Sequence, residues 1–191
     1  MLKKFKNWFN QQFYNKELQL RERYLDIKNH DVEINGTEYF LAKAMIPDIP
    51  EILGIERSVY GGQTPWDDRA FRTELMRKTD RLYLVLRRND YLVAFIGCSL
   101  NDHTKDCHIT NVAVAPNFQN HGLGYFLVTT IIKKARQLEY DKVTLEVRVS
   151  NTRAQKLYRD IGFVDNGTKK DYYFNDREDA LNMVLDITKI G

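Results

Sequence analysis

The sequence predicts one mixed α/β (α+β) domain at residues 31–191, preceded by a helical extension at residues 1–30. Short β-rich runs alternate with longer segments of helical apolar spacing, in the order β-β-α-α-β-β-β-α-β-α-β-β. Hydrophobic residues make up 43% of the chain and charged residues 29%, which is ordinary for a globular protein with a sizeable core. We therefore expect a mixed sheet of about seven strands flanked by about four helices.

The extension is expected to be helical, because Leu2, Phe5, Phe9 and Phe13 follow the spacing of one helix face. Its first sixteen residues contain four lysines and no acidic residue, whereas the remainder of the chain has 25 basic and 26 acidic residues. The apolar face is expected to pack on its own domain or on a second subunit. In the second case the extension would form a homodimer. A basic helix lying on a membrane surface is the alternative.

Turn-forming residues separate the elements of the domain. Asn-Gly at 35–36, between two β-rich runs, is a strong hairpin signal. A Gly-Gly pair at 61–62 breaks a helical pattern, Pro116 stops a strand, and Asn151 is a suitable helix N-cap. The expected elements are strands at 32–34 and 37–42, helices at 47–60 and 65–78, strands at 82–86, 91–99 and 108–114, a helix at 122–138, a strand at 142–149, a helix at 152–161, and strands at 163–170 and 179–187.

Composition excludes several classes of protein. No apolar run reaches the roughly 18 residues of a membrane helix, so no membrane span is expected, and the N-terminus does not resemble a secretory signal. Cys98 and Cys107 are too few for a disulfide framework, which favours reduced thiols in a cytoplasmic protein. A net charge of +3 is too small to indicate nucleic-acid binding, so no nucleic-acid partner is expected.

One short segment contains the residue types that bind metals. Asp102, His103, Asp106, Cys107 and His108 lie within seven residues of one another. Tetrahedral zinc sites usually take their ligands from two separated pairs, and the sequence offers no second cluster. We therefore expect no metal site.

The most informative segment is residues 112–124, where a strand ends, a short loop turns and a helix begins with Gly122 and Gly124. The first N–H groups of a helix have no intrahelical partner and lie at the positive end of its dipole, so they can bind a phosphate. The glycines remove side chains that would keep a phosphate from the backbone. The segment is neither a dinucleotide fingerprint nor a P-loop, and a plain tight turn is the alternative.

Residues 119–124 read Gln-x-x-Gly-x-Gly after a Val-Ala-Val strand, and this pattern resembles the cofactor-binding motif of the GNAT acetyltransferase superfamily. The resemblance implies a GNAT-like fold and acetyl-CoA as co-substrate, with its pyrophosphate on the loop and its pantetheine arm along the strand. Many relatives have Arg or Lys where Asn120 and His121 stand, so backbone donors would contribute more here. The implied cofactor-binding residues are Val112, Ala113, Val114, Gln119, Asn120, His121, Gly122, Leu123, Gly124, Tyr125 and Asn151.

A second pattern lies downstream: Leu-Glu-Val-Arg-x-Ser-Asn at 145–151, Leu-Tyr at 157–158 and Gly-Phe at 162–163. It resembles the ribosomal-protein-alanine N-acetyltransferases, which modify the α-amino group of a protein N-terminus. The resemblance covers about residues 40–187 and implies the same reaction, whereas the N-terminal extension is expected to be dispensable for chemistry. A small amine or a lysine side chain as acceptor is the alternative, and a non-catalytic acyl-CoA-binding module is a third. Further matches are Pro65-Trp66, Tyr172-Tyr173 and residues 177–180.

The resemblance implies that Glu146 is the general base and Tyr158 the general acid. An α-ammonium with a pKa of about 8 must lose its proton before it attacks a thioester, and a carboxylate can take that proton. A phenol with a pKa of about 10 can protonate the departing thiolate. Without the motif, a strand Glu is more often an ion-paired surface residue, and a helix Tyr more often a core residue.

The last hairpin is rich in acidic residues, and the resemblance puts it beside the acceptor with the Trp66 helix opposite. An acidic wall would attract a cationic N-terminus and basic residues behind it. A solvated hairpin turn is the alternative. The implied substrate-binding residues are Trp66, Asp171, Asp176, Glu178 and Asp179.

Overall fold

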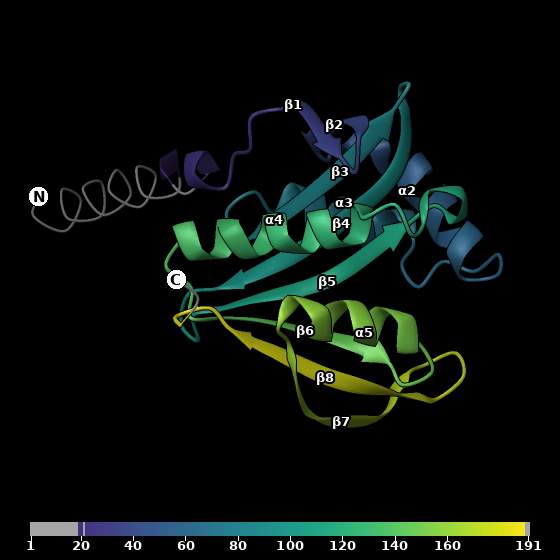
Figure 1. Ribbon diagram of the computed structural model, residues 1–191, viewed down its shortest axis with the longest axis vertical. Coiled ribbons are helices and arrows are strands. Elements are labelled where there is room, and N and C mark those ends of the chain that lie inside the picture. Colours follow the sequence, from purple (N-terminus) through teal and green to yellow (C-terminus); the bar gives the residue numbers. More distant parts are fainter. Residues whose placement is uncertain (1–18, 21, 190–191) are drawn as a thin grey trace, which may run out of the picture.

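The computed structural model describes residues 19–20 and 22–189 (Figure 1). In this part of the chain eight strands form one sheet in the order β1-β2-β3-β4-β5-β6-β8-β7, in which only β5 and β6 pair in parallel. The elements are β1 (His30–Ile34), β2 (Thr37–Lys43), η1 (Ile46–Asp48), α2 (Ile49–Val59), α3 (Asp68–Met76), β3 (Arg81–Arg88), β4 (Tyr91–Asn101), β5 (Asp106–Val114), η2 (Pro116–Phe118), α4 (Leu123–Gln137), β6 (Lys142–Arg148), α5 (Thr152–Ile161), β7 (Val164–Tyr173) and β8 (Glu178–Asp186).

The mixed α/β fold class is confirmed, with eight strands instead of about seven. Most boundaries differ from the expected ones by one to three residues, and three of these differences bear on the site. Helix α3 begins at Asp68, because the side chain of Asp67 caps it by accepting from the N–H of Ala70 (2.8 Å). Trp66 therefore precedes the helix. Strand β5 begins at Asp106 and β7 continues to Tyr173, since both ends stay paired with neighbouring strands.

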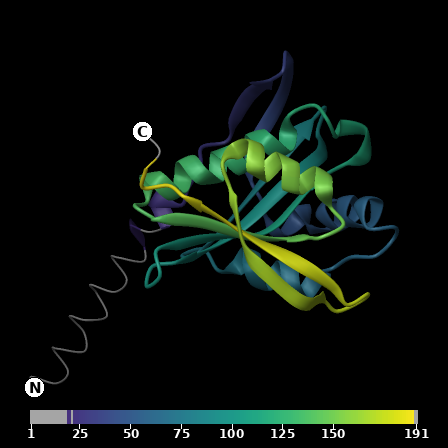
Figure 2. The ribbon, with the colours of Figure 1, turned by 60° about the horizontal axis from the view of Figure 1, so that its bottom comes forward.

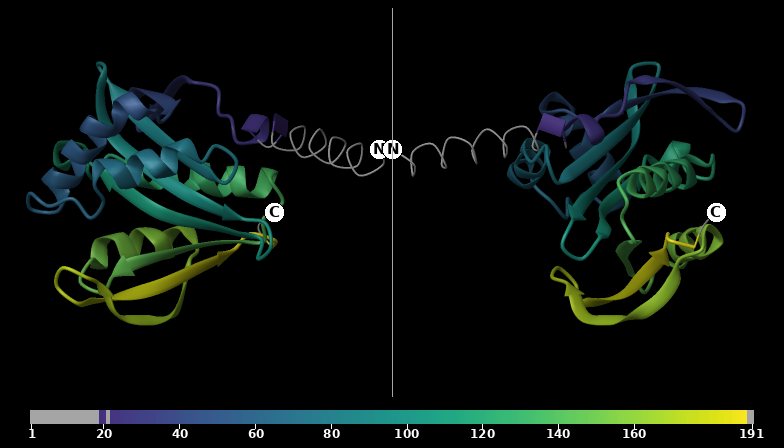
Figure 3. Two further views of the ribbon diagram at one scale, coloured as in Figure 1. Left: turned by 180° about the vertical axis from the view of Figure 1, so that it is seen from behind. Right: turned by 90° about the vertical axis from the view of Figure 1, so that its left-hand side faces the viewer.

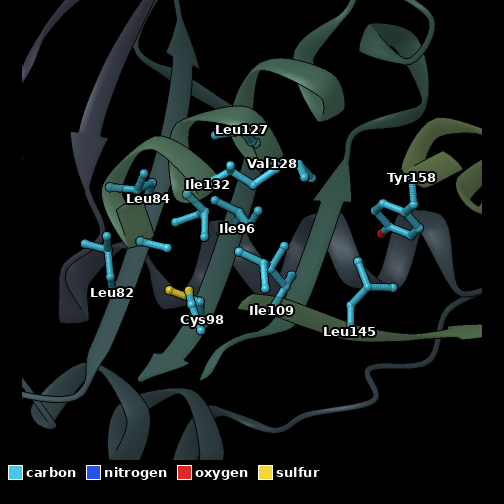
Figure 4. Packing of buried hydrophobic residues seen from close by; sticks show 14 of the residues in the cluster. Leu82, Leu84, Ile96, Cys98, Ile109, Leu127, Val128, Ile132, Leu145 and Tyr158 are labelled. Atoms are coloured by element: carbon cyan, nitrogen blue, oxygen red, sulfur yellow. The ribbon is translucent and has the colours of Figure 1, made fainter. Parts of the chain in front are cut away.

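Helices cover both faces of the sheet. Figure 2 shows α4 and α5 side by side over one face, and the larger apolar cluster fills the space between them and the sheet. Leu84, Ile96 and Val128 belong to this cluster (Figure 4). Helices α2 and α3 cover the other face through a second cluster that includes Phe71 and Phe95. In the described part of the chain, no helix has the length and apolar character needed to cross a membrane.

The sheet opens between its two parallel strands, β5 and β6. Residues 106–109 of β5 pair with residues 142–145 of β6. After these four pairs the two strands diverge (Figure 3). The divergence coincides with a β-bulge in β5. Asn111 pairs with Gly97 and Ile109 with Cys98 on β4, so Thr110 between them is an extra residue without a partner in the register. The bulge bends β5 away from β6 and leaves an opening at the end of β5 where α4 begins.

The extension's last residues pack on the domain. Leu25 is fully buried in the larger cluster, and Nζ of Lys134 on α4 donates to the carbonyl of Asp26 (3.0 Å). A truncation that preserves this core must therefore end before Leu25. The helix expected over the extension, to about residue 28, is described only in part: residues 19–20 and 22–24 are helical, and residues 26–29 are not. Residues 1–18, and a homodimer formed through them, fall outside the described residues.

Candidate active site

The loop between β5 and α4 has the geometry of an anion site. Asn120 (φ 66°) and Gly122 (φ 87°) adopt left-handed conformations, which turn the chain into α4. The first bond into the helix runs from the N–H of Phe126 to the carbonyl of Gly122 (2.9 Å). The N–H groups of Leu123, Gly124 and Tyr125 therefore have no acceptor inside the helix, and they suit the pyrophosphate of a coenzyme.

Hydrogen bonds to three other parts of the fold hold this loop. Gln119 donates through Nε2 to the carbonyl of Val114 (3.0 Å) and accepts through Oε1 from Nη1 of Arg153 on α5 (2.8 Å). Asn35, in the β1–β2 turn, donates through Nδ2 to the carbonyl of His121 (3.0 Å). The side chain of Gln119 thus braces the loop against β5 and α5. The contact of Asn35 with this loop was not predicted, because the sequence indicates only that Asn35 lies in a hairpin turn.

Removing the Asn35 side chain is expected to raise the Kd for coenzyme A about 2–10-fold, the weight of one hydrogen bond. Asn35→Gly is the suitable change, because Asn35 has φ 49° and glycine accepts that conformation. Asn89→Gly is the matched control, since Asn89 has φ 48° in the β3–β4 turn. Isothermal titration checks the result, and equal affinities for both folded variants would contradict it.

The bulge is braced by Tyr83. Its hydroxyl lies 3.1 Å from Oγ1 of Thr110 and donates to Oδ1 of Asn111 (3.1 Å). The ring crosses Gly97, where a Cβ would lie only 2.1 Å from the ring carbon Cε1 of Tyr83. Glycine at position 97 is therefore required for this contact, and the contact holds the opening between β5 and β6 in shape.

Glu146 lies on β6 at this opening, with its side chain only 7% exposed. Oε1 accepts from Nζ of Lys169 (2.5 Å), and Oε2 lies 3.1 Å from Nε2 of His108 and 3.4 Å from the Tyr172 hydroxyl. Burial opposes ionisation, but hydrogen bonds and positive charge from His108 and Lys169 outweigh it and lower the pKa of Glu146 to about 2. The site thus holds a buried carboxylate in contact with an ammonium group.

Tyr158 approaches from the opposite face of the sheet. It is buried on α5, against Phe163 (5.8 Å between ring centroids) and in the same cluster as Leu145, as Figure 4 shows. Because side chains alternate along β6, Glu146 points to the other face from Leu145. Burial raises the pKa of Tyr158, with a further contribution from Tyr60, so the phenol keeps its proton and can donate it.

Asn151 caps α5. Its side chain accepts from the N–H of Ala154 (3.1 Å), which confirms its expected place at the helix start. The hydrogen bond accounts for this residue without a coenzyme, so a contact with the coenzyme stays a prediction.

The acidic residues of the last hairpin are largely ion-paired. Nη1 of Arg148 bonds both Asp176 and Glu178 (2.7 Å each), and Nζ of Lys170 bonds Asp179 (2.6 Å). Another oxygen of Asp179 accepts from the N–H of Asp171 (3.0 Å). The wall therefore carries less free negative charge than its composition implies.

The loop before α3 faces this hairpin. Nδ2 of Asn175, in the β7–β8 turn, donates to Oε1 of Gln63 (3.2 Å). Trp66 packs on Phe71 (5.5 Å between ring centroids), and the nearby carboxyl of Glu56 on α2 is buried, with Oε2 lacking a hydrogen-bond partner among the described residues. Burial raises the pKa of Glu56 to about 7, so this carboxyl is only partly ionised at neutral pH. Glu56 was missed because one Glu on an amphipathic helix gives no sequence signal.

Similarity to known proteins agrees with this geometry. The profile of the acetyltransferase (GNAT) family matches residues 46–163. The chain is 32% identical over 145 residues (72% of this chain, 93% of the relative) to a [ribosomal protein bS18]-alanine N-acetyltransferase of Haemophilus ducreyi. It is 31% identical over 134 residues (69% and 82%) to the N-alpha-acetyltransferase RimI of Mycobacterium tuberculosis.

A solved structure covers most of this chain. The crystal structure of the ribosomal-protein-S18-alanine N-acetyltransferase from Escherichia coli superposes with a TM-score of 0.70, at 27% identity over 80% of this chain and 96% of that one. The anion loop, the bulge and the opening between β5 and β6 all lie within residues 46–163, which the family profile matches. The protein therefore belongs to the acetyltransferase (GNAT) family and is an N-acetyltransferase.

Proposed function

We propose that this enzyme transfers the acetyl group of acetyl-CoA to the α-amino group of a protein N-terminus, by direct attack in a ternary complex. The observation that carries the proposal is the buried Glu146 carboxylate, which already holds an ammonium group, that of Lys169, at 2.5 Å. An acceptor's α-ammonium is a cation of the same kind. Two of the relatives are named for a ribosomal protein, which favours a ribosomal protein as the acceptor. Such an acceptor would be modified in the cytoplasm.

The residues divide the reaction between two faces of the sheet. The N–H groups of Leu123 to Tyr125 would bind the pyrophosphate, and β5 from Val112 to Val114 would bind the pantetheine arm. Glu146 removes the proton of the acceptor on one face. Tyr158 protonates the thiolate from the other face, which completes the transfer without a covalent acyl-enzyme.

Lysine side chains are the second candidate acceptor, because the cation against Glu146 in this structure is itself a lysine. The hydrogen bond to Glu146 raises the pKa of Lys169, which keeps its amine protonated and unreactive. An acceptor with an α-amine of pKa about 8 loses its proton more easily than a lysine.

The experiment is incubation with acetyl-CoA and matched peptides, read by mass spectrometry. One peptide has a free α-amine and no lysine, its partner has a blocked N-terminus and one lysine, and spermidine represents small amines. We expect acetylation of the first peptide at a rate at least about tenfold above the others, since amines differing by roughly two pKa units differ in their free-base fraction by more than this. Preferred acetylation of the blocked peptide would indicate a lysine acceptor, and preferred acetylation of spermidine a small amine; either result would contradict the proposal.

A further inference from the structure

A chain of four polar side chains runs from Glu146 along β5 and β6. Nε2 of His108 lies 3.1 Å from Oε2 of Glu146, and Nδ1 lies 2.9 Å from Oγ1 of Thr144. Thr144 in turn donates to the carboxylate of Asp106 (2.9 and 3.1 Å to its two oxygens). The parallel register pairs His108 directly with Thr144, so the chain is built into the sheet.

The hydrogen atoms of this chain can be assigned by counting donors. An ionised carboxylate only accepts, so the single hydroxyl proton of Thr144 is committed to Asp106. The oxygen of Thr144 must then accept from Nδ1 of His108, which fixes the tautomer with its proton on Nδ1. Nε2 of the neutral imidazole is left as an acceptor that faces another acceptor, Oε2 of Glu146. A proton placed between these two atoms satisfies both.

We propose that His108 is the final acceptor of the proton that Glu146 removes from the acceptor amine, and that Thr144 and Asp106 position it. This inference rests on the proposed acetyl transfer. An N–H bond of the acceptor's ammonium breaks, and its electron pair stays on nitrogen for the attack. The proton binds the Glu146 carboxylate and then Nε2 of His108. Glu146 returns to its ionised form and His108 becomes an imidazolium.

The surrounding charges favour this end state. The imidazolium would lie between the carboxylate of Glu146 on β6 and that of Asp106, linked through Thr144. Lys169 and Tyr172 on β7 also contact Glu146, and Lys169 supplies a cation beside it. Histidine is the commonest general base in enzymes, and Nε2 of His108 lies within hydrogen-bond reach of the Glu146 carboxylate (3.1 Å).

The first test is the pH dependence of turnover in His108→Gln. Glutamine can still donate to Glu146 but takes up no proton. On one good peptide we expect kcat at pH 7 to fall about 10–100-fold with KM for acetyl-CoA unchanged, and to recover toward pH 9, where the amine loses its proton to water. An unchanged rate and pH profile would overturn the proposal.

The second test uses Thr144→Val, which removes the hydroxyl, and Thr144→Ser, which keeps it. We expect Thr144→Val to lower kcat about 3–10-fold and to shift the acid limb of the pH–rate profile. Thr144→Ser should behave as wild type. Imidazole ¹⁵N NMR, assigned by the signal lost in His108→Gln, should show the proton on Nδ1 in wild type and Ser but not in Val. A proton on Nε2 in neutral wild-type His108 would overturn the assignment.

The two proposals fail differently. Normal turnover of His108→Gln beside an inactive Glu146→Gln removes the relay and leaves acetyl transfer through Glu146 intact. Normal turnover of both variants would show that Glu146 is not the general base. The NMR measurement needs no turnover, so it reports on the hydrogen-bond chain even if the acceptor differs from the proposed one.

Discussion

Glu146→Gln is expected to lower turnover about 10²–10⁴-fold at neutral pH, the contribution of a positioned general base. Glutamine keeps the shape of the side chain at the opening between β5 and β6 but cannot take a proton. Part of the loss should return between about pH 8 and 9.5, where an α-ammonium of pKa about 8 ionises without help. A pH–rate profile of wild type and variant on one peptide measures both effects.

Stability must be measured beside turnover, because Glu146 also contributes to folding. Its folded pKa of about 2 lies below the 4.5 of an unperturbed Glu. The ionised form therefore stabilises the fold above pH 4.5, and this contribution is lost as the pH falls toward 2. Thermal unfolding at pH 7 shows whether the variant is folded during the assay.

Glu51→Gln is the matched control for Glu146→Gln. Glu51 lies on α2 and is paired with Arg87 (2.8 Å), and among the described residues it shares no hydrogen-bond partner with Glu146. It should lose its ion pair and keep near-normal turnover. Normal turnover of Glu146→Gln at pH 7 would assign the base to another group.

The local elements of the site could be predicted from sequence because their causes are local. An Asn-Gly turn, a glycine before α4 and the Asn151 cap each depend on neighbours along the chain. The partners of Glu146 could not be predicted in this way. His108 meets it through the parallel pairing of strands separated by α4, and Lys169 through the registers of β8 and β7.

Charge at the acceptor wall shows the same limit. Asp176, Glu178 and Asp179 are visible in the sequence as an acidic group, and so are Arg148 and Lys170 as cations. Whether the charges cancel depends on register, which pairs Arg148 with Ala180 and so places its guanidinium near the turn. The sequence therefore shows that the hairpin is acidic, but it does not show how many of its carboxylates are neutralised by ion pairs.

Tyr158→Phe is expected to lower turnover about 10²–10³-fold while the Kd for acetyl-CoA stays nearly constant, since the lost interaction belongs to the transition state. Phenylalanine keeps the ring packed against Phe163 and removes only the hydroxyl. Unlike the Glu146 variant, this one should gain nothing from high pH, because a free amine does not help a thiolate to leave.

The position of Tyr158 strengthens this expectation. Burial raises its pKa above the ordinary value of 10, so the hydroxyl stays protonated over the whole range in which the enzyme can be assayed. Tyr39→Phe is the control, because Tyr39 on β2 is buried in the same cluster. It should show near-normal turnover. Single-turnover kinetics with both variants, together with titration of acetyl-CoA, separate binding from chemistry. Recovery of Tyr158→Phe at high pH, or equal rates for the two variants, would assign the proton donor to a group other than Tyr158.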